Sequence, residues 1–293
     1  MAVVAAVAWL AYAWLGAAAA WVAARLGPTD VGRWGELLEA YPGTLLIVRV
    51  ERLLAAPQAG DVTPLVNEGQ SVATGTPLVR IQPESPGAPA VLVTAPFSGV
   101  ASFLGDGWEG AFSPEALAAA SLPEGPQPRS TPLVPRRPVA RGEPVVRLVD
   151  RRELWGVFFV DGSLPQAIGP GARIELVGAS AADGVPARVV ERVAASSGEG
   201  VRLVLRIDRQ PVDWLYRRVE REVRLVVGRY AGVILPASGL AWRRGRPGYW
   251  LATPGGPSFV AVEVVKQMGR HVVARGVPDG VRVYRWPRWL EGF

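Results

Sequence analysis

The chain has 293 residues, of which 49% are hydrophobic and 20% charged, and its formal net charge at pH 7 is +6. The absence of cysteine excludes disulfides, thiolate metal sites and cysteine nucleophiles. The basic charge comes from arginine scattered along strand-like segments, with Lys266 as the single lysine. No basic cluster is interleaved with aromatic residues, so nucleic-acid binding is not expected.

The N-terminal segment is long and apolar. Residues 2–24 contain no charged side chain, and roughly 20 apolar residues are enough to cross a bilayer as a helix. We therefore predict a transmembrane anchor within residues 1–26, followed by a linker at residues 27–41. No basic residue precedes the apolar run, which favours an anchor over a cleaved signal peptide, and a buried alanine-rich helix is the other alternative.

Past Pro42 the pattern changes to short β-branched runs separated by glycine and proline, which indicates a mostly β chain. An internal repeat lies in this region. Residues 72–81 read VATGTPLVRI, and residues 139–148 read VARGEPVVRL. Upstream of each copy stands the motif A-P-x-x-G, at residues 56–60 and 95–99. A duplicated β unit of this size is expected to pack its two apolar faces together as one flattened sandwich.

These motifs, together with the turn Asn67-Glu68-Gly69, resemble the half-motif of biotinyl and lipoyl domains over about residues 50–150. In those carriers a lysine between the halves holds the prosthetic group. The joining residues 82–90 contain no lysine, and Lys266 lies far outside the repeat, so a biotin or lipoate carrier is not expected. The same fold without the lysine resembles the barrel-sandwich hybrid of HlyD-type membrane fusion proteins, the periplasmic adaptors of efflux and export pumps.

The resemblance implies a lipoyl-like barrel-sandwich hybrid at residues 42–155, with two departures from the family. The family places an α-helical hairpin between the halves, and residues 82–90 are too few to form one. The second half is instead the longer one, because 40 positions separate its two motifs where the first half has 12. We predict an insertion at about residues 105–134, with one short helix that Ser113 caps and Pro114 begins.

The C-terminal half alternates apolar and polar residues, for example at residues 201–207, and this pattern predicts antiparallel strands. Their spacing suits a small closed β-barrel at residues 156–228, and their order resembles the barrel of the same adaptors. Residues 229–293 resemble the adaptors' membrane-proximal β domain, through the strand motif at residues 232–240 and the Gly-Val-Pro-Asp-Gly turn at residues 276–280. The fold class is therefore mostly β after an N-terminal transmembrane helix.

Candidate catalytic and metal-binding residues are sparse. His271 is the only histidine and stands in a valine-rich run, where a strand residue is expected rather than a general base. One histidine cannot build a multi-histidine zinc site. Asp106 and Glu109 frame an Asp-Gly-Trp-Glu segment, for which a turn is the expected structure and a Ca²⁺ or acid–base site the alternative.

Two further segments are rich in residues that are common at binding surfaces. Residues 253–257, Thr-Pro-Gly-Gly-Pro, predict a hairpin loop and not a phosphate cradle, because neither a Lys-Ser/Thr pair nor a helix follows them. A candidate contact patch, with a packed edge strand as its alternative, consists of Trp214, Tyr216, Arg217 and Arg218. We assign no catalytic, cofactor-binding or metal-binding residue.

The resemblance implies a non-enzymatic adaptor, anchored in the cytoplasmic membrane by residues 2–24, with the bulk of the chain outside the cytoplasm. The expected partners are a transporter permease and other copies of the chain, without cofactor or nucleic acid. Arg25 and Arg33 follow the span, where the positive-inside tendency favours the cytoplasm, so the orientation rests on the resemblance alone. An envelope or cell-division accessory protein of the same fold is the main alternative, and an envelope enzyme is less favoured.

Overall fold

The computed structural model describes residues 27–85, 87–112, 114–122, 130–135, 137–160, 162–194 and 200–287. Strands dominate these ranges, as predicted, and the helices within them are three short 3₁₀ segments. None of the three is long and apolar enough to cross a membrane. The span predicted at residues 2–24 lies outside the described residues.

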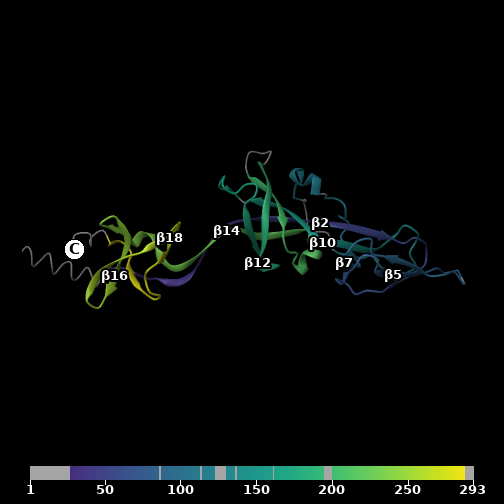
Figure 1. Ribbon diagram of the computed structural model, residues 1–293, viewed down its shortest axis with the longest axis horizontal. Coiled ribbons are helices and arrows are strands. Elements are labelled where there is room, and N and C mark those ends of the chain that lie inside the picture. Colours follow the sequence, from purple (N-terminus) through teal and green to yellow (C-terminus); the bar gives the residue numbers. More distant parts are fainter. Residues whose placement is uncertain are drawn as a thin grey trace, which may run out of the picture. The chain divides into compact units, whose positions relative to one another are not determined.

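The chain forms two compact units (Figure 1). One contains residues 40–227, and the other contains the described residues before Ala40 together with those from Gly228 onward. The boundary falls inside two long strands, β2 (Arg33–Ala55) and β14 (Val219–Pro236). The chain therefore passes from one unit to the other twice, each time along a strand.

The two repeat copies build one β sandwich. Its strands are β3 (Asp61–Pro64), β4 (Ser71–Val72), β5 (Pro77–Gln82), β6 (Val91–Thr94), β7 (Gly99–Ser102) and parts of β2 and β10 (Pro144–Val160). β3, β5 and β6 form one sheet, whereas β4, β7, β10 and β2 belong to another. A single core contains Leu78 and Ile81 from the first copy and Val146 and Leu148 from the second. The predicted single module is thus confirmed.

Backbone hydrogen bonds show how the two copies interlock. The N–H of Ala56 donates to the carbonyl of Glu143 at 2.9 Å, and the N–H of its repeat equivalent Ala95 donates to Thr76 at 2.9 Å. The return bonds to Ala56 and Ala95, from the glycines of the facing motifs, measure 2.8 and 2.7 Å. Each A-P-x-x-G motif therefore pairs with the V-A-x-G motif of the other copy, and neither half completes its hydrogen bonds alone.

Gly60 and Gly99 occupy equivalent positions in the repeat, where backbone of another strand approaches closely. A Cβ at Gly60 would lie 2.2 Å from the carbonyl oxygen of Gln82, and a Cβ at Gly99 would lie 2.4 Å from that of Val149. Gln82 and Val149 are themselves equivalent, each ten residues after the first valine of its copy. The glycine of each A-P-x-x-G motif is thus required for the close approach of two strands.

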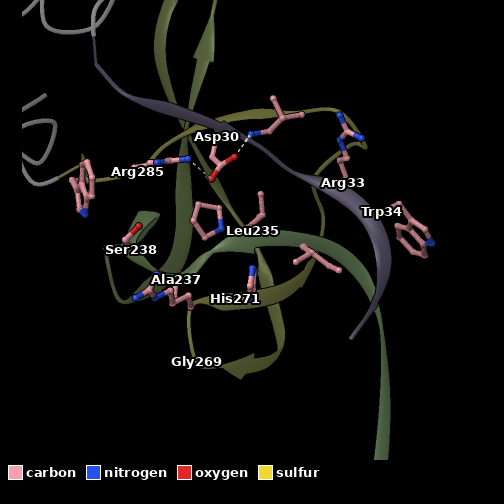
Figure 2. A pocket seen from close by; sticks show the side chains of 14 residues that line it. Asp30, Arg33, Trp34, Leu235, Ala237, Ser238, Gly269, His271 and Arg285 are labelled. Atoms are coloured by element: carbon pink, nitrogen blue, oxygen red, sulfur yellow. Dashed lines mark hydrogen bonds and ion pairs between the residues drawn. The ribbon is translucent and has the colours of Figure 1, made fainter. Parts of the chain in front are cut away.

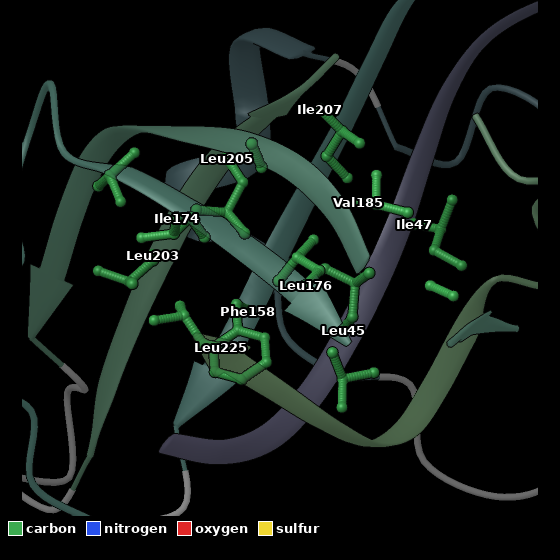
Figure 3. Close-up of a cluster of buried hydrophobic side chains, with 14 of the residues drawn as sticks. Leu45, Ile47, Phe158, Ile174, Leu176, Val185, Leu203, Leu205, Ile207 and Leu225 are labelled. Atoms are coloured by element: carbon green, nitrogen blue, oxygen red, sulfur yellow. The ribbon is translucent and has the colours of Figure 1, made fainter. Parts of the chain in front are cut away.

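The second module of residues 40–227 is a sheet with a core of its own, in the range where a small closed β-barrel is expected, and we call it the barrel. Its own strands are β11 (Arg173–Gly178), β12 (Ala181–Ala194) and β13 (Val201–Ile207), to which β14, β10 and β2 contribute one segment each. β2 pairs with both β10 and β14, which closes the series β14-β11-β12-β13-β10-β2. Figure 3 shows the barrel core, where Leu45 from β2, Phe158 from β10 and Leu225 from β14 belong to one buried cluster.

The sandwich and the barrel share two strands. Residues 43–49 of β2 lie in the range expected for the sandwich, yet Leu45 and Ile47 are part of the barrel core. β10 pairs with β7 of the sandwich through Arg147–Val149 and with β13 of the barrel from Leu154 onward. The boundary predicted between residues 155 and 156 therefore falls inside a continuous strand.

The insertion predicted at residues 105–134 packs against the barrel. Its described elements are β8 (Leu104–Gly105), the 3₁₀ helix η1 (Pro114–Ala119) and β9 (Thr131–Pro132). η1 is the short helix predicted to begin at Pro114, whereas its expected cap Ser113 lies outside the described residues. Leu117 of η1 is buried with Leu46 and Val48 of β2. Since side chains alternate along a strand, these two point away from the barrel core, and the insertion covers them.

The other unit is built from the C-terminal strands and β1 (Thr29–Val31). The strands are β15 (Leu240–Arg243), β16 (Arg246–Thr253), β17 (Gly256–Ala261), β18 (Glu263–Met268), β19 (His271–Arg275) and β20 (Arg282–Tyr284), and the 3₁₀ helix η3 (Ala237–Gly239) follows β14. One sheet has the order β1-β20-β16-β15 with β17 on β16, and β18 and β19 extend from β14. Residues 253–257 form the turn of the β16–β17 hairpin, as predicted.

Residues 27–41 are not a linker, and that prediction was wrong. They form β1 and the start of β2, with β1 antiparallel to β20 and the N–H of Gly32 donating to the carbonyl of Val281 at 2.8 Å. The acidic residues of this segment pair with C-terminal bases: Asp30 with Arg285 at 3.2 Å, Glu36 with Arg229 at 3.0 Å and Glu39 with Lys266 at 2.7 Å. Local pattern could not show these partners because they stand at the far end of the chain.

Candidate functional site

The joining residues 82–90 form the turn between β5 and β6, the position at which carrier domains hold their prosthetic group. The last strand pair before the turn is Ile81 with Val91, and the side-chain amide of Gln82 donates to the carbonyl of Ala88 at 3.1 Å. The turn offers no amine for attachment. Its described residues contain no helix, in agreement with the expectation that no α-helical hairpin fits here.

Lys266 takes part in an ion pair at a distant position in the chain. Its ammonium group on β18 donates to the carboxylate of Glu39 at 2.7 Å and lies 5.0 Å from the ring centroid of Tyr230. The hydrogen bond to Glu39 raises the pKa of Lys266, and the same bond lowers the pKa of Glu39. The lysine therefore holds β18 to β2 and β14, which is a structural role.

Six charged side chains of residues 40–227 form a buried ionic cluster: Arg49, Glu51, Asp106, Glu109, Arg147 and Arg218. None of their side chains is more than 7% exposed. The carboxylate of Asp106 accepts hydrogen bonds from Arg49 and Arg218, each at 2.7 Å, and lies 3.5 Å from Arg147. Glu51 pairs with the same three arginines. Three positive and three negative charges thus balance in a region that excludes water.

The neighbouring groups of the ionic cluster set the protonation state of Asp106. Burial alone would raise the pKa of its carboxyl group, but the hydrogen bond and charge of Arg218, the N–H of Trp108 and the charge of Arg49 outweigh it and lower that pKa. Burial, followed by the charge of Arg218, lowers the pKa of Arg49 to about 10. Both groups are therefore ionised at neutral pH, and the cluster acts as a set of fixed ion pairs.

The Asp106–Glu109 segment has the geometry of the predicted turn. Asp106 accepts the N–H of Trp108 at 3.0 Å, and Glu109 accepts the N–H of Asp106 at 2.6 Å. Because guanidinium groups occupy the oxygens of Asp106, its carboxylate is not available as a ligand for Ca²⁺. The segment fastens the insertion to β2 and β10.

The candidate contact patch does not form a common surface. Trp214, in the 3₁₀ helix η2 (Val212–Leu215), is fully buried, and Arg218 belongs to the ionic cluster. The guanidinium of Arg49 donates to the carbonyls of Trp214 and Leu215 at 2.8 and 2.6 Å, so the cluster holds this segment in place. Tyr216 donates its hydroxyl to Glu68 at 3.0 Å. Of the four residues, Arg217 has the most exposed side chain described, at 53%.

A pocket of about 900 Å³ lies in the unit that contains β15 to β20. Residues 30–34, the end of β14 with η3, the β18–β19 turn and residues 285–286 line it (Figure 2). We call the rim formed by Val31, Arg33, Trp34, Arg270, Arg285 and Trp286 the Arg-Trp face. Its apolar members are large yet exposed, by 42% for Val31, 62% for Trp34 and 59% for Trp286.

Two of the three arginines of the Arg-Trp face have no acidic partner among the described residues. Arg285 reaches Asp30 at 3.2 Å, as the dashed line in Figure 2 shows. Arg33 and Arg270 make no ion pair with any residue in the part of the chain that the structure describes. The sequence signal for this face is the recurrence of the dipeptide Arg-Trp at residues 33–34 and 285–286, and a third copy at residues 288–289 lies outside the described residues. Local pattern does not connect these segments, because they lie at opposite ends of the chain.

His271 is the first residue of β19, in agreement with the expected strand position, and it lines the same pocket. The single carboxylate in the lining, that of Asp30, is paired with Arg285. Within the described ranges no three histidine, aspartate and glutamate side chains gather to hold a metal ion. The lining of the pocket thus carries cationic and aromatic side chains, which are suited to binding a partner.

Comparison with known families identifies one module of this chain. Residues 51–150 match the family model described as "RND related, barrel-sandwich hybrid domain". The match covers about a third of the chain and coincides with the sandwich of the two repeat copies. The barrel-sandwich hybrid that the resemblance predicted is confirmed for this module. A search of curated proteins gave no match.

Solved structures resemble the chain more loosely. The match to ZneB from Cupriavidus metallidurans covers 90% of this chain and 93% of that chain, with 10% identity and a TM-score of 0.35. The match to MacA from Actinobacillus actinomycetemcomitans covers 87% of this chain and 98% of that chain, also with 10% identity and a TM-score of 0.35. Scores at this level do not support an argument on domain arrangement.

Proposed function

We propose that this protein is a non-enzymatic adaptor of an efflux or export transporter, anchored in the cytoplasmic membrane by residues 2–24, with its bulk outside the cytoplasm. The observation that carries the proposal is the barrel-sandwich hybrid at residues 51–150. Its two half-motifs interlock around one core, and its joining turn has no lysine for a prosthetic group. Such a module can supply surfaces and spacing, but not a reacting group.

The mechanism is geometric. Within residues 40–227, β2 and β10 both continue from the sandwich into the barrel, and their pairing shifts register between Val149 and Leu154, where the two modules meet. The buried ionic cluster fastens the insertion and the η2 segment to the same two strands. Since close-packed interiors transmit strain instead of absorbing it, a partner bound to the sandwich and a partner bound to the barrel are held at a fixed spacing. The proposed partners are a transporter permease and further copies of the chain.

Purification of the complex tests the proposal. The full chain, tagged at its C-terminus, is crosslinked in membranes of the source cells, extracted in mild detergent and identified with its partners by mass spectrometry. We expect a transporter permease at an amount comparable to the chain, and its absence from a parallel purification of an unrelated single-span protein. Permease recovery equal in the two purifications contradicts the adaptor function.

The alternative is an envelope or cell-division accessory protein with the adaptor fold. The short turn at residues 82–90 favours it, because adaptors of the family reach distant partners through the α-helical hairpin that this turn cannot hold. The same purification separates the two functions. Recovery of division or wall-synthesis proteins without a permease supports the accessory protein and contradicts the adaptor.

A further inference from the structure

The net charge of the chain resides entirely in one unit. Residues 1–39 and 228–293 contain twelve basic and six acidic residues, a balance of +6 that equals the charge of the whole chain. Residues 40–227 contain twenty of each and are neutral. Positive charge confined to one part of a protein attracts a negatively charged partner to that part.

Among the residues that the structure describes, exposed tryptophan is found in this unit alone. Trp34, Trp242 and Trp286 are the exposed tryptophans among the described residues, and two of them belong to the Arg-Trp face. Tryptophan is enriched where a protein meets the headgroup region of a bilayer, because its ring is apolar and its N–H is polar. Arginine beside it is attracted to anionic lipid headgroups. The composition of the face therefore fits a lipid surface better than an aqueous one.

The position of the Arg-Trp face along the chain brings it close to the apolar N-terminal segment. The N–H of Arg285 donates to the carbonyl of Pro28 at 3.0 Å, so both ends of the face meet where the described chain begins. Asp30 stands six positions after Ala24, the last residue of the uncharged run. A fully extended chain spans at most about 22 Å over six residues. If residues 2–24 cross the bilayer, Asp30, at the start of the pocket lining, lies within that distance of the end of the span.

We propose that the Arg-Trp face docks on anionic phospholipid headgroups, with Arg33 and Arg270 at the phosphates and Trp34 and Trp286 at the level of the headgroups. The inference rests on the membrane anchor of the proposed function and adds a second, specific contact to it. Asp30 does not oppose the contact, since its carboxylate is paired with Arg285. The pocket behind the rim then faces the bilayer and gives room for a headgroup.

A single labelled cysteine tests the docking, because the natural chain has none. Ser238, an exposed residue that lines the pocket, is replaced by cysteine and carries an environment-sensitive fluorophore. The full chain is reconstituted in lipid nanodiscs of phosphatidylcholine alone or with phosphatidylglycerol. We expect a blue shift and protection from aqueous iodide with phosphatidylglycerol only. Both effects should be lost in high salt and in the double variant Arg33→Gln, Arg270→Gln.

The matched control is Ser258→Cys, an exposed position on β17 that does not line the pocket and should stay accessible to iodide in both lipids. Protection at Ser238 that is equal in both lipids indicates a protein occupant, such as a second copy, and contradicts the proposal. A chain that enters the discs but leaves Ser238 accessible contradicts the docking and leaves the anchor standing. A chain that does not co-elute with the discs contradicts both.

Discussion

Arg49, Arg147 and Arg218 depend on two carboxylates, Asp106 and Glu51, for the balance of their buried charge. Each arginine lies within 4 Å of both carboxylates, and all five side chains are at most 2% exposed. Loss of one carboxylate leaves an uncompensated positive charge in a dry environment, which is costly, whereas loss of a surface partner is not. The cluster is therefore the part of residues 40–227 most sensitive to a change of a single charge.

We predict that Asp106→Asn lowers the free energy of unfolding by about 3–5 kcal/mol, the usual range for breaking a buried ion pair. Asparagine has nearly the same volume as aspartate. The lost free energy of unfolding therefore measures the effect of charge and hydrogen bonding and not of packing. Urea unfolding of the detergent-solubilised chain, followed by circular dichroism, measures it. The control Glu36→Gln removes a surface pair of 3.0 Å with Arg229 and should cost less than about 1 kcal/mol. Equal losses in the two variants contradict the prediction.

The pH dependence of stability follows from the same carboxylate. The pKa of Asp106 is lowered in the folded chain, and the carboxyl group in the unfolded chain has a pKa of about 3.9. Its contribution is thus fully present above that pH and is lost as the pH falls toward the folded-state pKa. We predict that the stability difference between the natural chain and Asp106→Asn is constant from pH 7 to about pH 5 and shrinks below pH 4. A difference that grows on acidification contradicts this sign.

At the scale of strands, the interlocked repeat makes two distant glycines equivalent. We predict that Gly60→Ala and Gly99→Ala each destabilise the chain by about 1–3 kcal/mol, because their Cβ atoms would lie 2.2 and 2.4 Å from a carbonyl oxygen. Gly169→Ala is the control, since its nearest atom would be 3.7 Å away, and it should change stability by less than about 0.5 kcal/mol. Thermal unfolding of the three variants gives the comparison. A loss at Gly60 without one at Gly99 contradicts the equivalence.

The strands of the sandwich could be predicted from the sequence because the repeat consists of short local motifs. The A-P-x-x-G and V-A-x-G motifs each fix a turn or a close approach, and both copies are short enough to recognise by eye. The alternation of residues 201–207 likewise predicts β13, since one face of that strand is buried in the barrel. Where a residue's neighbours in the sequence decide its environment, the sequence pattern is sufficient to predict the local structure.

The shared strands, the linker and the Arg-Trp face could not be predicted in this way. Leu45 and Leu46 are neighbours, yet one faces the barrel core and the other faces the insertion, so the run has no alternation to show which module it serves. Asp106 was expected in a turn, and its buried charge pairs were not, because its three arginine partners come from β2, β10 and the residue before β14. Contacts between residues far apart in the sequence create such environments, and a single sequence does not reveal those contacts.

At the scale of the whole molecule, the topology of the chain can be tested without disturbing either unit. We predict that Ser163→Cys, at an exposed position between β10 and β11, reacts with a membrane-impermeant maleimide in intact spheroplasts, because the bulk of the chain is proposed to lie outside the cytoplasm. The cysteine-free natural chain is the blank. Labelling that occurs only after the cells are lysed contradicts the proposed orientation.

The turn between Gln82 and Val91 has a consequence for how such proteins diversify. It leaves the sandwich from a hairpin whose register is already fixed at Ile81 and Val91, and lengthening a loop adds only about 0.6 kcal/mol for each doubling. A coiled-coil arm grafted between Glu84 and Ala88 should therefore fold without disturbing the module beneath it. The length of this turn can therefore change while the strand pairing beneath it stays the same.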